Sequence, residues 1–192
     1  MSDMISQIQL GDHAALFYHT RAEQLSIVIP FIAIGLERNE RCMYIAEDNS
    51  IDLICRKLQE AGVDVQKAQQ KNALRVLTKH ETYLKHGVFE PDKMIGDLCN
   101  EVQSSVDMGF TGLRAAGELS WALDLPSALM QIVEYEEELE EHFYSKFAAL
   151  CQYDESRYPG HIIQKMKSLH PVTVCGGELI RKVSKRGLNP TF

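Results

Sequence analysis

The sequence lacks the glycine-rich loops that bind phosphate groups. No stretch matches G-x-x-x-x-G-K-[ST] or G-x-G-x-x-G, and the turn after the first predicted strand reads YHTRAEQ, residues 18–24. Without these glycines the backbone does not wrap a phosphate, and without the lysine no side chain neutralises it. The G-x-S-x-G turn of α/β-hydrolases is also missing. These absences count against a P-loop nucleoside triphosphatase and against an α/β-hydrolase.

Targeting segments and cysteine pairs are missing as well. The start, MSDMISQIQLGDH, has neither the basic nor the apolar region of a signal peptide, and no apolar run reaches the roughly 18 residues of a membrane span. The five cysteines are scattered, odd in number and without a C-x-x-C pair, as is typical of reduced thiols. We therefore expect a cytoplasmic protein without a membrane segment.

Basic residues are in the minority. The net charge of -7 gives no concentrated basic face for phosphates, so we predict no direct contact with nucleic acid. The one basic cluster, Arg181, Lys182, Lys185 and Arg186, is predicted to be a solvated tail. Hydrophobic residues make up 45% of the 192 residues, which is typical of a globular protein, and we predict one domain over residues 1–192.

Apolar segments of strand length alternate with helical patterns along the chain. The predicted strands span residues 13–18, 41–48, 73–78, 112–121, 146–154 and 171–176. The predicted helices span residues 21–39, 50–62, 125–143 and 159–170, with a further one from about Pro91. Pro30 should bend the first helix or delay its start. The alternation predicts an α/β fold with three layers, α/β/α, around a mainly parallel sheet.

Polar residues follow several of the predicted strands. In open parallel sheets ligands bind outside the carboxyl ends of the strands, which selects Tyr18, Glu118, Trp121, Tyr153 and Asp154. Each of these residues is also compatible with a plain role as a turn residue or helix cap. Glu118 stands out because a carboxylate among small apolar residues needs a partner, a shifted pKa or a ligand. Trp121 suits either the wall of a ligand pocket or the core.

A metal site is a weaker interpretation of the same residues. His13, His170 and Cys151 are residue types that join a carboxylate such as Glu118 around zinc-like ions. Their spacing matches no metal signature, however, so we expect no metal and no cofactor. His170 precedes Pro171 and has the alternative role of fixing how the chain enters the last strand.

An ordered series of segments resembles one known family. The segments are HAALFYHTRAEQL, PFIAIGLERNERCMYIAED, TYLKHGVFEPDKM, GFTGLRAAGELSWAL, YEEELEEHF, CQYDESRYPG and LHPV. Together they resemble the MEDS domain, the methanogen/methylotroph DcmR sensory domain, from about Asp12 to Val174, with a core of about 12–176. The resemblance implies a RecA/KaiC-related fold that has lost its phosphate loop. It also implies sensing of small hydrocarbon derivatives, such as methylated or halogenated one-carbon compounds.

The resemblance also implies which residues bind the ligand. They are the matching positions His13, Tyr18, Glu118, Trp121, Cys151, Tyr153, Asp154 and His170. Family members signal to an attached histidine kinase or DNA-binding domain. The segment after Val174 is too short for either, so we expect a separate signalling partner, either a histidine kinase or a transcription regulator.

Three functional hypotheses follow. The first is a non-catalytic sensor in which Glu118, Tyr153 and His170 hold a small organic ligand against Trp121. The second is a RecA-like nucleotide-binding or hydrolysing protein, with Glu118 activating water and Glu47 or Asp48 holding magnesium. The third is a pure interaction module. Burial of Trp121 and Glu118 away from solvent would support this hypothesis.

Two surface features are candidate interfaces. The helix from Pro126 to His142 carries six glutamates, Glu134, Glu136, Glu137, Glu138, Glu140 and Glu141, which suit either a partner surface or a solvated face. Scattered surface apolar residues such as Phe89, Phe110 and Phe192 leave room for a homodimer.

Overall fold

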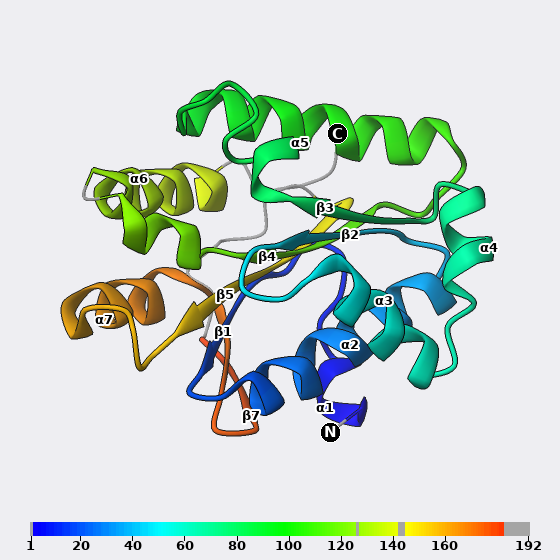
Figure 1. Ribbon diagram of the computed structural model, residues 1–192, viewed down its shortest axis with the longest axis horizontal. Helices are drawn as coiled ribbons and strands as arrows, with labels where there is room; N and C mark the ends of the chain where they lie inside the picture. Colours follow the sequence, from blue (N-terminus) through cyan, green and yellow to red (C-terminus); the bar gives the residue numbers. More distant parts are fainter. Residues whose placement is uncertain (1, 126, 142–144, 183–192) are drawn as a thin grey trace.

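The computed structural model shows a central sheet with helices on both faces (Figure 1). It describes residues 2–125, 127–141 and 145–182. The elements in chain order are α1 Ser2–Ile5, β1 His13–Tyr18, α2 Arg21–Glu37, β2 Arg41–Ala46, α3 Ile51–Glu60, α4 Val65–Gln70, β3 Leu74–Thr78, η1 Lys79–Glu81, α5 Pro91–Asp107, β4 Leu113–Glu118, η2 Ser120–Asp124, α6 Ala128–Glu141, β5 Phe147–Asp154, α7 Gly160–Leu169, β6 Val172–Cys175 and β7 Glu178–Arg181.

The sheet has seven strands in the order β3-β2-β4-β5-β1-β6-β7. Neighbouring strands are parallel except for the antiparallel hairpin of β6 and β7. Residues of β1, β2, β4 and β5 are almost entirely buried, as expected for strands covered on both faces. The predicted α/β fold with a mainly parallel sheet is confirmed.

Successive residues of each strand face opposite sides of the sheet. One side, the α6 face, packs against α5, α6 and α7 and takes Ala15, Ala115 and Cys151. The other side, the α2 face, packs against α1, α2 and α3 and takes Ala14, Ala116 and Leu150. The two apolar cores are therefore separated by the sheet.

The first long helix begins where its apolar pattern predicts, so the alternative that Pro30 delays its start is wrong. Pro30 neither delays nor ends α2, which runs from Arg21 to Glu37 with Pro30 inside it. A capping box fixes its start: the Thr20 hydroxyl accepts from the backbone of Glu23, and the Glu23 carboxylate accepts from the backbone of Thr20. Burial of the helix against the sheet and these caps offset the cost of the proline.

The C-terminal segment also differs from the prediction of a solvated tail. Gly176 and Gly177, both with positive φ, form a turn into β7, and Arg181 makes an ion pair of 2.6 Å with Asp12. Lys182 donates to the backbone carbonyls of Lys167 and Ser168. Lys185, Arg186 and Phe192 lie outside the described residues.

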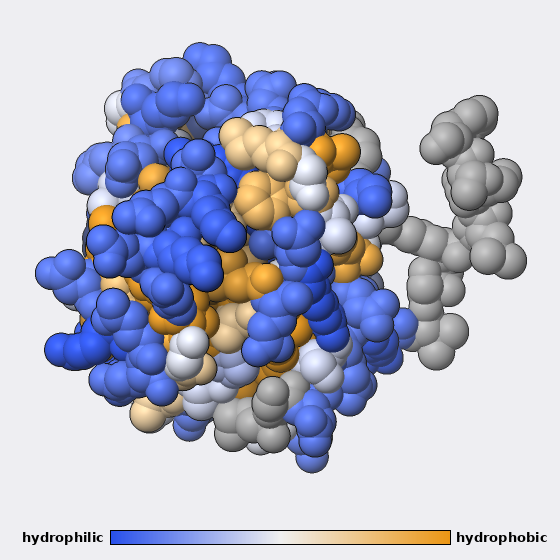
Figure 2. Space-filling model, turned by 90° about the vertical axis from the view of Figure 1, so that its right-hand side faces the viewer, coloured by the Kyte–Doolittle hydropathy of each residue, from blue (hydrophilic) through white to orange (hydrophobic). Residues whose placement is uncertain are grey.

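Smaller differences occur elsewhere. The short helices α1 and α4 were not predicted, and the fourth strand ends at Glu118 because Ser120–Asp124 turn into a 3-10 helix. Among the described residues, no helix combines the length and apolar character needed to cross a bilayer. On the side shown in Figure 2, hydrophilic side chains predominate, with apolar ones between them.

Candidate functional site

Four buried side chains on the α6 face bring metal-ligating and acidic groups together. They are His13, Glu136, Cys151 and His170, which we call the His-Glu-Cys cluster. Their ligand atoms all lie within 4.8 Å of one another. Each of the four side chains is at most 8% exposed. A group of this kind in the core calls for an explanation beyond packing.

The carboxylate of Glu136 is the centre of the cluster. Its Oε2 lies 3.0 Å from Nε2 of His13 and 3.3 Å from Nε2 of His170. The Cys151 thiol donates to the same oxygen at 3.5 Å, and the Tyr153 hydroxyl donates to Oε1 at 2.7 Å. Both carboxylate oxygens are therefore engaged by neighbouring side chains.

Each imidazole ring is oriented by a contact of its Nδ1 atom with a residue outside the cluster. The Nδ1 of His170, just after α7, lies 2.9 Å from the carbonyl of Met166, and because a carbonyl only accepts, Nδ1 carries the proton. The unprotonated Nε2 of His170 thus faces the cluster. The Nδ1 of His13, at the start of β1, lies 3.0 Å from the carboxylate of Glu140, one helical turn after Glu136. Both rings present Nε2 to the interior.

The contacts within the cluster shift the pKa values of its members in different directions. Burial alone would lower the pKa of His13, but contacts with Glu136 and Glu140 outweigh it and raise this pKa. Burial and the neighbouring charge of His13 lower the pKa of His170. Burial would raise the pKa of Glu136, yet its contacts with His13 and His170 bring it well below its ordinary value. The arrangement favours an ionised Glu136 beside a neutral His170.

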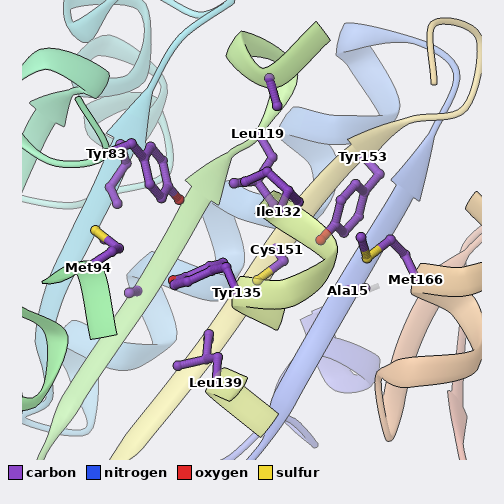
Figure 3. Packing of buried hydrophobic residues seen from close by; sticks show 14 of the residues in the cluster. Ala15, Tyr83, Met94, Leu119, Ile132, Tyr135, Leu139, Cys151, Tyr153 and Met166 are labelled. Atoms are coloured by element: carbon purple, nitrogen blue, oxygen red, sulfur yellow. The ribbon is translucent and has the colours of Figure 1, made fainter. Parts of the chain in front are cut away.

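A small cavity lined by buried side chains lies beside the cluster on the same face. Its volume is about 20 Å³, and its walls include Tyr83, Met94, Gly117, Tyr135 and Cys151. In Figure 3, α6 lies in front of the strands, between Tyr83 on one side and Tyr153 on the other. Gly117 is required here, since a Cβ at that position would overlap the Tyr83 hydroxyl.

Tyr83, which lines the cavity, packs against two further aromatic side chains, Phe89 and Trp121. Tyr83 stacks on Trp121 with ring centroids 5.3 Å apart, and Phe89 contacts Trp121 at 4.9 Å and Tyr135 at 5.6 Å. Tyr83, Phe89 and Trp121 form what we call the aromatic lid. Phe89 is only 4% exposed, so the prediction that it is a surface apolar residue is wrong. Trp121 is 1% exposed and therefore sealed from solvent.

Glu118 lies on the α2 face, away from the cluster. Its carboxylate accepts hydrogen bonds from the Tyr44 hydroxyl, from the Asn49 amide at 2.8 Å and from the backbone N–H groups of Glu47, Asp48 and Asn49. Burial raises the pKa of Glu118, although these hydrogen bonds act in the opposite direction. The partner that the sequence required is therefore supplied by the protein itself.

The structure thus divides the predicted site residues between the two faces. His13, Cys151, Tyr153 and His170 meet on the α6 face, and Trp121 packs in the apolar core of that face. Tyr18 packs in the core of the α2 face, the face on which Glu118 also lies. Asp154 is a turn residue, whose carboxylate accepts hydrogen bonds from the backbone N–H and the hydroxyl of Ser156. The predicted crevice joining Glu118 to Tyr153 and His170 is not formed, because alternate strand residues point to opposite sides.

The residue that sequence reasoning missed is Glu136. It was assigned to a solvated or partner-binding acidic face, whereas the structure buries it completely. The position of Glu136 in the helical pattern indicates that it is buried. It lies on the same stripe of α6 as the buried residues Ile132, Tyr135 and Leu139. A glutamate on the apolar stripe of a helix should have been paired with the buried histidines.

The start of α2 bears on the nucleotide hypothesis. At this position, after β1, the backbone N–H groups of His19 and Thr20 both donate to the carboxylate of Glu23. A helix N-terminus after the first strand is where P-loop proteins hold phosphate. In this chain the carboxylate of Glu23, rather than a phosphate, accepts hydrogen bonds from the backbone N–H groups at the start of α2. Glu47 and Asp48, the predicted magnesium ligands, make ion pairs with Lys79 and Arg157.

Solved structures define the fold class as KaiC-like. A KaiC-like protein from Pyrococcus horikoshii OT3 superimposes with a TM-score of 0.60 at 15% identity, covering 85% of this chain and 69% of that one. A second P. horikoshii protein, solved in complex with an unknown peptide, has a TM-score of 0.64 at 14% identity, covering 90% of this chain and 80% of its own. These likenesses confirm the predicted RecA/KaiC-related fold.

Within this fold class, the chain belongs to the MEDS family. The family model, described as the methanogen/methylotroph, DcmR sensory domain, matches residues 12–171. The transcriptional repressor DcmR of Methylorubrum extorquens is 28% identical over 149 residues, which cover 77% of this chain and 53% of the repressor. The chain therefore spans about half the length of this curated relative. Family and relative support a sensory or regulatory role.

Proposed function

We propose that this chain is a non-catalytic sensor domain that binds a small hydrocarbon derivative in the cavity beneath the aromatic lid. The observation that carries the proposal is the cavity itself, whose walls combine aromatic rings, Met94 and the Cys151 thiol. An apolar cavity of this kind selects small apolar molecules, because a charged or strongly polar ligand would lose its hydration without gaining partners. The signal would pass to a separate partner protein.

The size of the cavity determines how a ligand enters. About 20 Å³ is little more than the roughly 10–15 Å³ that one water requires. A halomethane or methylated compound must therefore displace a side chain, and Tyr83 is the best placed. Tyr83 lies in the connection between β3 and α5, so its displacement would also move the start of α5. A ligand that binds this displaced state better shifts the population toward it.

Among the predicted ligand residues, we assign direct contact to Cys151 and an indirect role to Trp121, which holds Tyr83 in place. Glu118, Tyr18 and Asp154 do not line this cavity: Glu118 and Tyr18 lie on the α2 face, and Asp154 stabilises the turn after β5. The nucleotide alternative is disfavoured because Glu23 holds the α2 N-terminus and Glu118 is engaged by Tyr44 and Asn49.

The interaction module remains a second candidate. The observation in its favour is that Trp121 and Glu118 are each 1% exposed, as that hypothesis requires. The acidic α6 surface would then be its contact face. It predicts that no small molecule stabilises the protein.

Filling the cavity should abolish the ligand response. Ala115 lines the cavity, whereas Ala116, the next residue of β4, packs on the opposite face. Ala115→Val and Ala116→Val should each cost about 1–3 kcal/mol of stability by overpacking. Thermal-shift screens with halomethanes, methylated amines, alcohols, thiols and ATP with magnesium should show stabilisation of the wild type and Ala116→Val by an organic compound.

Loss of this response in Ala115→Val alone would locate the ligand in the cavity. An unchanged response in Ala115→Val would place the ligand elsewhere. Silence across the whole panel would favour the interaction module, and stabilisation by ATP alone would favour the nucleotide hypothesis.

Opening of the lid can be followed through the single tryptophan of the chain. Gly117→Ala should displace Tyr83 and expose Trp121, because the new Cβ overlaps the Tyr83 hydroxyl at the far end of a flexible side chain. We expect iodide to quench Trp121 fluorescence several-fold more efficiently in this variant than in the wild type. Gly96→Ala is the control, since a Cβ there meets open space. Equal quenching in both variants would contradict a movable Tyr83.

A further inference from the structure

We propose that the His-Glu-Cys cluster is a binding site for a zinc-like divalent transition-metal ion, with His13, Glu136, Cys151 and His170 as its four ligands. Two imidazoles, one thiolate and one carboxylate are a donor set that such ions accept, and the nitrogen and sulfur donors disfavour magnesium and calcium. The metal site and the proposed ligand cavity share Cys151, but the observations that support the metal site do not depend on a ligand in the cavity.

Four of the six distances between the ligand atoms are close to the edges of a tetrahedron around one ion, and all six are within 4.8 Å. Metal–ligand lengths of zinc imply edges of about 3.4 Å between nitrogen or oxygen ligands and about 3.6 Å where one ligand is sulfur. The structure has 3.0 Å and 3.3 Å from Glu136 Oε2 to the Nε2 atoms of His13 and His170. Cys151 Sγ lies 3.5 Å from the same oxygen and 3.6 Å from Nε2 of His13.

The groups behind the ligands have the arrangement that orients metal ligands. Ligating histidines usually donate their other ring N–H to a carboxylate or a backbone carbonyl. His13 faces Glu140 through Nδ1, and His170 donates from Nδ1 to Met166. The Tyr153 hydroxyl donates to the second oxygen of Glu136 at 2.7 Å. Each of the three oxygen or nitrogen ligands is thus oriented by a contact on the side away from the proposed ion.

One atom of the cluster points independently to a bound cation. The Nε2 of His170 is completely buried and has no hydrogen-bond partner. In the neutral ring, whose proton is on Nδ1, this nitrogen presents a lone pair toward the carboxylate of Glu136 at 3.3 Å. Two electron-rich atoms facing each other in the core are unfavourable unless a cation lies between them. A metal ion satisfies both, with the Cys151 thiol proton released to solvent on binding.

Such an ion would join separate parts of the fold. His13 lies on β1, Cys151 on β5, Glu136 on α6 and His170 between α7 and β6. Coordination would therefore fasten α6 and α7 to the centre of the sheet.

Cobalt(II) is a suitable probe, because a thiolate ligand gives it a near-ultraviolet charge-transfer band and a tetrahedral site gives strong visible bands. Tag-free full-length protein would be dialysed against chelator, refolded with increasing cobalt(II) and then titrated with zinc. We expect one equivalent of cobalt to bind with both sets of bands, and zinc to remove them. Cys55→Ser, a half-buried cysteine on the opposite face, should behave as the wild type.

Cys151→Ser should abolish the charge-transfer band. Should that variant fail to fold, Tyr153→Phe keeps all four ligands and tests the support of Glu136, with an expected loss of about 10- to 100-fold in metal affinity. Folded wild-type protein that binds no stoichiometric metal would overturn the proposal. So would a charge-transfer band that persists in Cys151→Ser, or cobalt bound only weakly and without thiolate bands through exposed histidines.

Discussion

Glu118→Ala should lower the free energy of unfolding by about 3–5 kcal/mol. The substitution leaves the Tyr44 hydroxyl, the Asn49 amide and three consecutive backbone N–H groups without their acceptor around a side chain that is 1% exposed. Glu118 therefore ties the loop after β2 to the end of β4. Urea unfolding followed by circular dichroism measures the loss.

The control is a second carboxylate in the same loop. Asp48→Asn weakens only a partly exposed ion pair with Arg157 and should cost about 1 kcal/mol or less. A cost below about 1 kcal/mol for Glu118→Ala would mean that water replaces the carboxylate and that Glu118 does not hold the loop after β2. A ligand response lost in a Glu118 variant would therefore report on the fold as much as on binding.

Arg114→Met should be comparably destabilising, by about 3–5 kcal/mol. Arg114 is completely buried, donates from Nε to Glu40 and from Nη2 to the carbonyl of Ile8 at 3.2 Å, and lies over the ring of Phe31. Removing it leaves the buried carboxylate of Glu40 without its charge partner. Gly35 makes the room for this side chain, since a Cβ there would overlap it.

Two further variants make the Arg114 prediction specific. The double variant Arg114→Met with Glu40→Gln should recover part of the loss, because no unpaired charge is left in the core. Arg157→Met removes an arginine from a half-exposed pair and should change stability by about 1 kcal/mol or less. Equal losses in the single and double variants, measured by urea unfolding, would show that packing rather than charge pairing is responsible.

Much of the architecture follows from local pattern. The predicted strands 13–18 and 146–154 match β1 and β5 within one residue, because a run of buried apolar residues between turns has few other solutions. The hairpin of β6 and β7 was missed since β7 is short and mostly exposed, and it depends on the pairing of Arg181 with Asp12. That contact links positions far apart in the sequence.

The site was harder to predict than the fold. His13, Cys151 and His170 were recognised as a group, but the carboxylate that joins them is Glu136 and not Glu118. Glu118 and Trp121 are three residues apart yet lie on opposite faces, because the chain leaves β4 through the 3-10 turn of η2. Which carboxylate meets the histidines depends on how α6 lies across the sheet, and no local pattern contains this.

The carboxylate of Glu23 at the start of α2 has a consequence for what the domain can report. At the start of α2 the chain supplies its own anion, because the backbone N–H groups of His19 and Thr20 bind the Glu23 carboxylate. ATP and ADP would have to displace a tethered charge that is always present at high effective concentration. The output of the sensor that we propose would then be independent of the energy charge of the cell and would follow its chemical signal alone.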